Sequence, residues 1–164
     1  MKRLSRILAL LMTMLFAAGL LAGCGGKSLK GKYTAVYDMK DYLNQGLGGA
    51  ATVDSVNMEF YLDIQDGEKY HLYTDENQVK EVLTDAMSEA FEGVMTKDQV
   101  KDLIDQMDTS EFNKSDEGTY KVDGDKITFT SNDGSSQDGT IGGDGNITVK
   151  LKDGAMNAEL VFKK

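Results

Sequence analysis

The 164-residue chain contains one cysteine, one histidine, no tryptophan and no proline. A single cysteine permits no disulfide within the chain, so the stability of its folded part has to come from a hydrophobic core. A zinc site built from several histidines or thiols is excluded for the same reason. The sequence also lacks a Gly-x-Ser-x-Gly elbow, which leaves nucleophilic catalysis with little support. We therefore interpret His71 as a surface or hydrogen-bonded strand residue.

Cationic residues are scarce as well. The chain has 18 lysines and arginines against 27 aspartates and glutamates, and no arginine follows Arg6. Residues 1–23 hold three of the cationic residues and no acid, so the remainder carries 15 against 27, a net charge of −12. Nucleic acids and anionic lipid surfaces both require clustered lysine and arginine. The composition argues against both as partners.

A long hydrophobic run occurs at the N-terminus. Lys2, Arg3 and Arg6 precede an apolar stretch from Ile7 to Ala22. A positive segment followed by an apolar one is the order found in secretory signal peptides. About 18 apolar residues also suffice to span a bilayer. An uncleaved anchor helix with an incidental cysteine is therefore the alternative.

The cysteine that ends this run favours the signal peptide. Leu21-Ala22-Gly23-Cys24 resembles the bacterial lipobox, in which the thiol is acylated and the chain is cut just before it. The resemblance implies that residues 1–23 are a signal peptide and that Cys24 is the site of lipid attachment. It also implies a location at the cell membrane, lipid-anchored on the extracytoplasmic face.

Residues 24–30 are predicted to be a lipidated, flexible tether before a domain that spans 31–164. One acyl chain binds a bilayer only marginally, whereas two or three hold firmly, because each buried methylene adds ~0.8 kcal/mol. Six extended residues after Cys24 reach only ~20 Å. We expect the domain to lie close to the bilayer surface.

The domain opens with a strand and a short helix. Residues 31–37 alternate in polarity, which predicts a strand. Residues 38–44 are expected to form a short helix with Tyr42 and Leu43 turned inward.

A clear hairpin follows. Its first strand places four apolar side chains on one face: Met58, Phe60, Leu62 and Ile64. Asp66-Gly67 predicts a type I′ turn, which requires positive φ at both central positions. The return strand is expected at residues 68–74.

The period then changes to that of a helix, and residues 76–108 are predicted to be an inserted helical pair. The first stripe contains Val79, Val82, Leu83, Ala86, Met87, Ala90, Phe91 and Val94. Thr96 and Gln99 form a capping box that begins the second helix. Four side chains of that helix are expected to point inward: Val100, Leu103, Ile104 and Met107.

The apolar stripe of the first helix has to cover something. We expect it to pack on the face that carries Met58 and Ile64 as a fixed plug, with Phe91 as a core residue. The alternative is a mobile lid over a ligand cavity, hinged at Gly93.

Strands return after residue 113. They are expected at residues 119–122, 126–130, 139–142, 146–151 and 156–163, separated by turns rich in aspartate and glycine. Strands at this spacing indicate an antiparallel meander or barrel. The predicted fold class is α+β, mainly β.

Parts of the domain resemble the lipocalin-like barrels. Gly31-Lys32-Tyr33 is similar to their Gly-x-Trp opening, with tyrosine in place of tryptophan. Residues 118–129 and 159–163 resemble the C-terminal meander of small lipocalin-like lipoproteins of Gram-positive bacteria. The resemblance implies an apolar ligand cavity. The helical pair departs from the family pattern, which leaves open whether the barrel is closed or incomplete.

Two sets of side chains are candidates for binding. A small amphipathic ligand would contact tyrosines of the first half of the domain, for which we name Tyr33, Tyr37, Tyr61 and Tyr73. Calcium would require clustered oxygens, and the C-terminal turns contain Asp123, Asp125, Asp133, Asp138 and Asp144. None of these follows the EF-hand spacing, and aspartate is also an ordinary turn former. We therefore expect no metal and no cofactor.

The leading hypothesis is a non-enzymatic envelope lipoprotein that binds a small amphipathic ligand or an envelope protein. Alternatives are an accessory subunit of a membrane complex and a carboxylate-dependent glycosidase. No tryptophan is available to stack a sugar. A large apolar cavity would favour ligand carriage, whereas a filled barrel with an exposed apolar patch on the helical pair would favour a protein partner.

Overall fold

The computed structural model describes residues 28–49, 51–109, 112, 115–153 and 156–164. The predicted signal peptide and Cys24 lie outside the described residues. Among the helices of the described ranges, none is both long and apolar enough to cross a membrane.

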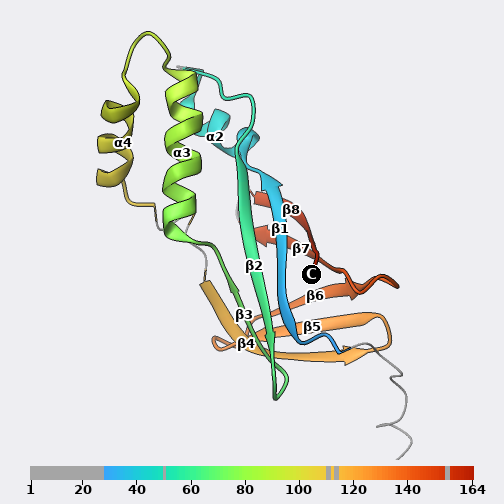
Figure 1. The fold of residues 1–164 in the computed structure, drawn as a ribbon. Coiled ribbons are helices and arrows are strands. Elements are labelled where there is room, and N and C mark those ends of the chain that lie inside the picture. The colour runs from blue at the N-terminus through green and yellow to red at the C-terminus, as the bar shows by residue number, and fades with distance from the viewer. Residues whose placement is uncertain (1–27, 50, 110–111, 113–114, 154–155) are drawn as a thin grey trace, which may run out of the picture.

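Eight antiparallel strands form one sheet in which each strand pairs with the next along the chain. The strands are β1 (Gly31–Asp38), β2 (Asn57–Gln65), β3 (Lys69–Tyr73), β4 (Ser115–Asp123), β5 (Lys126–Ser131), β6 (Ser136–Ile141), β7 (Ile147–Asp153) and β8 (Met156–Phe162). This order confirms the predicted meander and the mainly β fold class (Figure 1).

The sheet curls into a nearly closed barrel with one seam, between β1 and β8. Thr34 and Lys163 form a single antiparallel bridge there, with N···O distances of 2.8 and 2.9 Å. The other seven pairs of adjacent strands are joined by ladders of three or more residue pairs. The predicted lipocalin-like barrel is confirmed, and of the two alternatives for its closure the structure shows the incomplete one.

Apolar side chains fill the inside of the barrel. Met58, Phe60, Leu62 and Ile64 are all buried, as the alternation in β2 predicts. The remaining interior positions contribute further large buried side chains: Tyr33, Tyr70, Ile127, Phe129, Ile147, Val149, Leu160 and Phe162. The interior of the described barrel is therefore a packed core.

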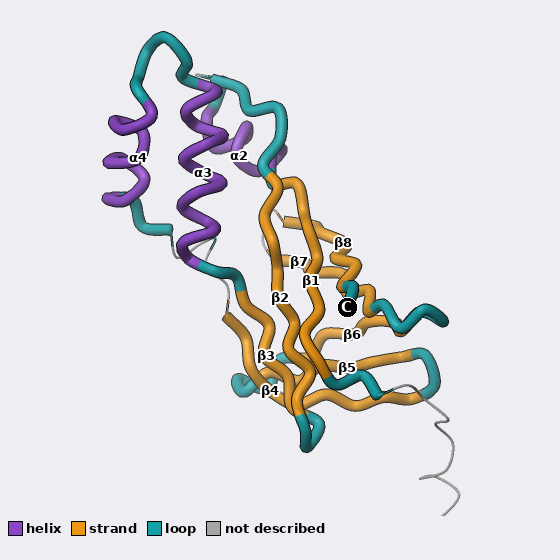
Figure 2. Tube along the Cα trace, viewed as in Figure 1, coloured by secondary structure: helices purple, strands orange, loops and turns teal. Residues whose placement is uncertain are grey.

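Three helices gather at one end of the barrel (Figure 2). α2 (Lys40–Leu47) follows β1, and α3 (Glu76–Ala90) and α4 (Lys97–Gln106) lie between β3 and β4. Tyr42 and Leu43 of α2 are half-buried against the core, as expected. The capping box of Thr96 and Gln99 is also confirmed.

α3 packs on β2, and α4 packs on α3 rather than on the barrel (Figure 1). Val79 and Leu83 of α3 are buried, but Phe91 is a half-buried C-cap residue, because the helix ends at Ala90. The prediction that Phe91 is a core residue is therefore wrong, although α3 packs on β2 as expected. Val94 lies beyond the helix and is 77% exposed, contrary to its predicted place in the stripe.

α4 buries only half of its apolar stripe. Val100 and Ile104 are buried as predicted, whereas Leu103 and Met107 are exposed. The prediction that all four side chains point inward is wrong for Leu103 and Met107. A single neighbouring helix covers a narrower arc of α4 than a sheet and a helix together would cover.

The β2–β3 hairpin is confirmed, but its turn is not the two-residue type I′ turn. Gln65 pairs with Lys69, so the turn contains three residues. Positive φ occurs at Gly67 (74°) and Glu68 (58°). The Glu68 carbonyl accepts a hydrogen bond of 2.8 Å from the amide of Tyr120, which ties the additional residue to β4.

β4 begins four residues earlier than the sequence predicts. Residues 115–119 pair with β3 and residues 118–123 pair with β5. Gly118 and Thr119 belong to both ladders, so the strand changes partner at this point.

Candidate functional site

The four tyrosines named as candidate ligand contacts do not line a common cavity. Tyr33 is 1% exposed, and its hydroxyl donates to the carbonyl of Leu29 at 2.6 Å. The ammonium of Lys164 lies 5.3 Å from the centre of the Tyr33 ring. Burial raises the pKa of Tyr33. Tyr37 is half-buried against the core. In this structure Tyr33 is part of the core.

Tyr61 and Tyr73 come together on the outer face of the barrel. Their rings stack at 5.3 Å, and the His71 ring stacks on Tyr73 at 4.6 Å. His71 also lies 3.2 Å from the hydroxyl of Ser115, in keeping with a hydrogen-bonded strand residue. Since Tyr73 of β3 stacks on Tyr61, its partner residue on β2, this outer stack stabilises pairing between the two strands. A ligand role for Tyr61 and Tyr73 stays a prediction.

The structure contains a polar cluster inside the barrel that the sequence did not predict. The hydroxyl of Tyr70 on β3 donates to the carboxylate of Asp116 on β4 at 2.6 Å. Ser131 on β5 donates to the same carboxylate oxygen at 2.8 Å. Tyr70 is 3% exposed, and burial followed by the bond to Asp116 raises its pKa to about 12. No local pattern signals this cluster, because its members are brought together only by strand register.

The Tyr70 cluster predicts a loss of stability in alkali. A tyrosine whose pKa is about 12 when folded and 10 when unfolded stabilises fully below pH 10, and this contribution is lost as pH rises through 12. Two pKa units correspond to at most about 2.7 kcal/mol. Tyr70→Phe should therefore be less stable than the wild type at pH 8, with the difference shrinking by pH 12. Urea unfolding at several pH values measures this, and a difference independent of pH would contradict it.

Two of the five aspartates named as candidate calcium ligands are engaged within their own turns. Asp133 accepts from the amide of Ser135 at 2.8 Å, and Asp144 from the amide of Asn146 at 3.0 Å. Asp138 lies in β6 rather than in a turn, and its ion pair with Lys126 of β5, at 2.9 Å, lowers its pKa. Within the described parts of the chain, no three histidine, cysteine, aspartate or glutamate side chains are grouped so as to hold a metal ion. These contacts support the role of turn former.

α3 and α4, called the helical pair from here on, carry the most distinctive surface. Leu103 of α4 and Met107, the C-cap residue that follows the helix, are 49% and 45% exposed. The amide of Met107 donates to the carbonyl of Leu103, one helical turn earlier, at 3.1 Å. They continue the stripe whose other half, Val100 and Ile104, is buried. We call Leu103 and Met107 the α4 stripe. An apolar stripe of this kind on a surface helix marks a candidate interaction site.

This apolar stripe lies in strongly acidic surroundings. Residues 75–108 contain ten acidic side chains and three lysines, a net charge of −7 out of the −12 expected for residues 24–164. All three lysines pair with carboxylates: Lys80 with Glu76, Lys97 with Asp85, and Lys101 with Asp105. The acids in excess give the helical pair a negative surface.

A groove of about 300 Å³ runs between α3 and α4, and all three lysines line it. Lys97 of α4 reaches Asp85 of α3 at 2.6 Å, so the groove is in part an ion-paired contact between the helices. The hydrogen bond from Lys101 lowers the pKa of Asp105. A glycosidase needs a general acid whose pKa is raised. The groove therefore does not favour the glycosidase alternative.

Comparisons of the chain with protein-family models, with curated proteins and with solved structures give no significant match.

Proposed function

We propose that the protein is a membrane-anchored envelope lipoprotein that acts without catalysis as a binding module for another protein. Leu21-Ala22-Gly23-Cys24 supports the anchor through its likeness to a lipobox. The exposed α4 stripe above a filled barrel carries the binding function. A neighbouring subunit of a membrane complex is one form that the partner can take.

The filled interior favours a protein partner over carriage of a small ligand. Side chains such as Phe60, Phe162 and Met58 occupy the space that an apolar ligand would need in a barrel of this size. Besides Val36, Val94, Val122 and Val161, the exposed large apolar side chains of the described residues are Leu103 and Met107, which form the α4 stripe. Such a surface suits a partner that brings its own apolar side chains to the contact.

Charge further defines the partner. The net charge of −7 over residues 75–108 surrounds the α4 stripe with carboxylates such as Asp102 and Asp98. A partner with apolar residues inside a lysine- or arginine-rich rim would match this surface and would associate faster at low salt. Binding should therefore weaken as ionic strength rises.

Photo-crosslinking tests this function in the cells that make the protein. A photoreactive residue replaces Gln106, which is exposed and one turn from Leu103. We expect a discrete adduct with another protein, and we expect Leu103→Asp in the same chain to abolish most of it. Because Leu103 is half-exposed, this substitution should alter folding stability by less than about 1 kcal/mol.

Two controls make the result specific. The photoreactive residue at Thr119, on the outer face of β4, should not give the same adduct. Circular dichroism of Leu103→Asp should match that of the wild type. An adduct at Gln106 that survives Leu103→Asp, or no adduct at all, would count against the proposed function.

A further inference from the structure

The chain before β1 is fixed to the barrel. Ser28 and Leu29 use their carbonyls as acceptors, from the Lys164 ammonium at 3.1 Å and from the Tyr33 hydroxyl at 2.6 Å. Leu29 packs against the core, and Lys30 forms an ion pair with Asp66 in the β2–β3 turn. Residues 28–30, which the sequence assigns to a flexible tether, are therefore part of the folded domain. We call the end of the barrel that carries them the base.

Fixing residues 28–30 shortens the tether to Gly25, Gly26 and Lys27. Four residue steps from Cys24 to Ser28 span at most about 14 Å. With Cys24 lipidated, the base would be held within this distance of the headgroups. A tether of this length leaves the domain little freedom to tumble above the bilayer.

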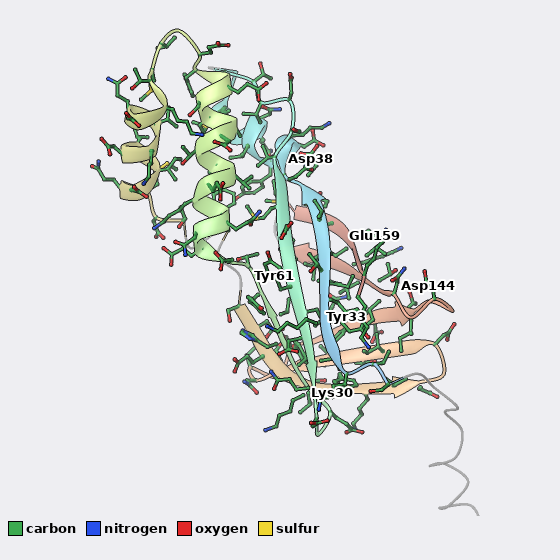
Figure 3. All side chains as sticks on the ribbon, viewed as in Figure 1. Lys30, Tyr33, Asp38, Tyr61, Asp144 and Glu159 are labelled. Carbon is green, nitrogen blue, oxygen red and sulfur yellow. The ribbon has the colours of Figure 1, made fainter. Side chains whose placement is uncertain are left out.

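The helical pair lies at the other end of the molecule. Figure 3 labels Lys30 beside the β2–β3 hairpin and Asp38 at the opposite end of β1, next to the helices. Five residues of β3 at about 3.3 Å each and fifteen of α3 at about 1.5 Å each separate the hairpin from the α3–α4 loop. The loop is thus on the order of 35–40 Å from the base.

From these placements we propose that the lipidated protein stands on the bilayer by its base and presents the helical pair as the end farthest from the membrane. The proposal rests on the lipid anchor of the proposed function. The charge of the domain also favours this upright orientation. If the domain lay on its side, the acidic helical pair would be repelled by anionic headgroups. The partner surface on α4 would then lie in the half of the molecule that is farther from the bilayer.

Short-range fluorescence quenching tests this orientation. The mature lipidated protein, whose cysteine is acylated, is given one free thiol by Gln65→Cys at the base or by Glu92→Cys in the α3–α4 loop. Both residues are exposed. Each variant is labelled and reconstituted into phosphatidylglycerol-containing vesicles that carry a headgroup nitroxide. We expect most of the fluorescence to be lost at position 65 and almost none at position 92.

A lengthened tether provides the control. Twenty glycine and serine residues inserted between Gly26 and Lys27 should restore most of the fluorescence at position 65, because a flexible linker of this length extends by about 25 Å. Equal quenching at the two positions in vesicle-bound protein would overturn the orientation and leave the anchor intact. Failure of the purified protein to carry lipid or bind vesicles would overturn both.

Discussion

Cys24→Ser is expected to remove the protein's lipid and, with it, its stable attachment as a mature membrane protein. In the proposed anchor the Cys24 thiol would be the nucleophile that accepts the diacylglyceryl group, and the chain offers no second thiol in its place. Each buried methylene of the two acyl chains contributes ~0.8 kcal/mol to membrane binding. The binding free energy lost with the chains is therefore larger than any single contact of the folded domain could supply. We expect either an uncleaved precursor or mature-length protein in the medium.

Intact-mass measurement and detergent-phase partitioning distinguish these outcomes. The precursor would retain residues 1–23 and carry no lipid, whereas the wild type should lack those residues and carry the mass of its acyl groups. Gly25→Ala is the matched control, because it leaves Cys24 and a small neighbouring residue in place. An unchanged mass and unchanged partitioning in Cys24→Ser would refute the lipid anchor.

Local patterns of the sequence predicted the elements of the fold. Alternation in β2 identified the buried Met58 and Ile64, and the capping box at Thr96 marked the start of α4. Turn residues placed the hairpins, so the antiparallel meander followed from the order of its parts. These signals work because helix and strand periods are properties of neighbouring residues.

Contacts between residues that are far apart in the sequence could not be predicted from such local patterns. An apolar stripe shows that a helix has a face to bury, but not how much of it a neighbour will cover, and this accounts for the exposed Leu103. The cluster of Tyr70 with Asp116 joins residues 46 positions apart. The fixing of Leu29 depends on Tyr33 reaching back by one hydrogen bond. Leu103 is part of the proposed site, and the fixing of Leu29 decides how that site is placed relative to the membrane.

The change of partner along β4 likewise gave no sequence signal, and it predicts a large effect of Gly118→Ala. A Cβ at position 118 would lie 2.0 Å from the carbonyl oxygen of Thr130 and 2.9 Å from the Cα of Ser131. Both are backbone atoms of β5, so a side-chain rotation cannot relieve the clash. Glycine at this point lets β4 bend while it pairs with β3 and β5, as at the corners of other barrels.

We expect Gly118→Ala to lower the free energy of unfolding by more than about 3 kcal/mol, above the usual cost of overpacking because two strands must separate. Domains of this size are stable by about 5–15 kcal/mol, so the variant should unfold at much lower urea concentration or fail to accumulate. Gly143→Ala is the matched control, because a Cβ there meets no atom within 4 Å, and it should change stability by less than about 0.5 kcal/mol. Equal urea midpoints for the two variants would show that β5 yields at Thr130, and the bend at Gly118 would then not require glycine.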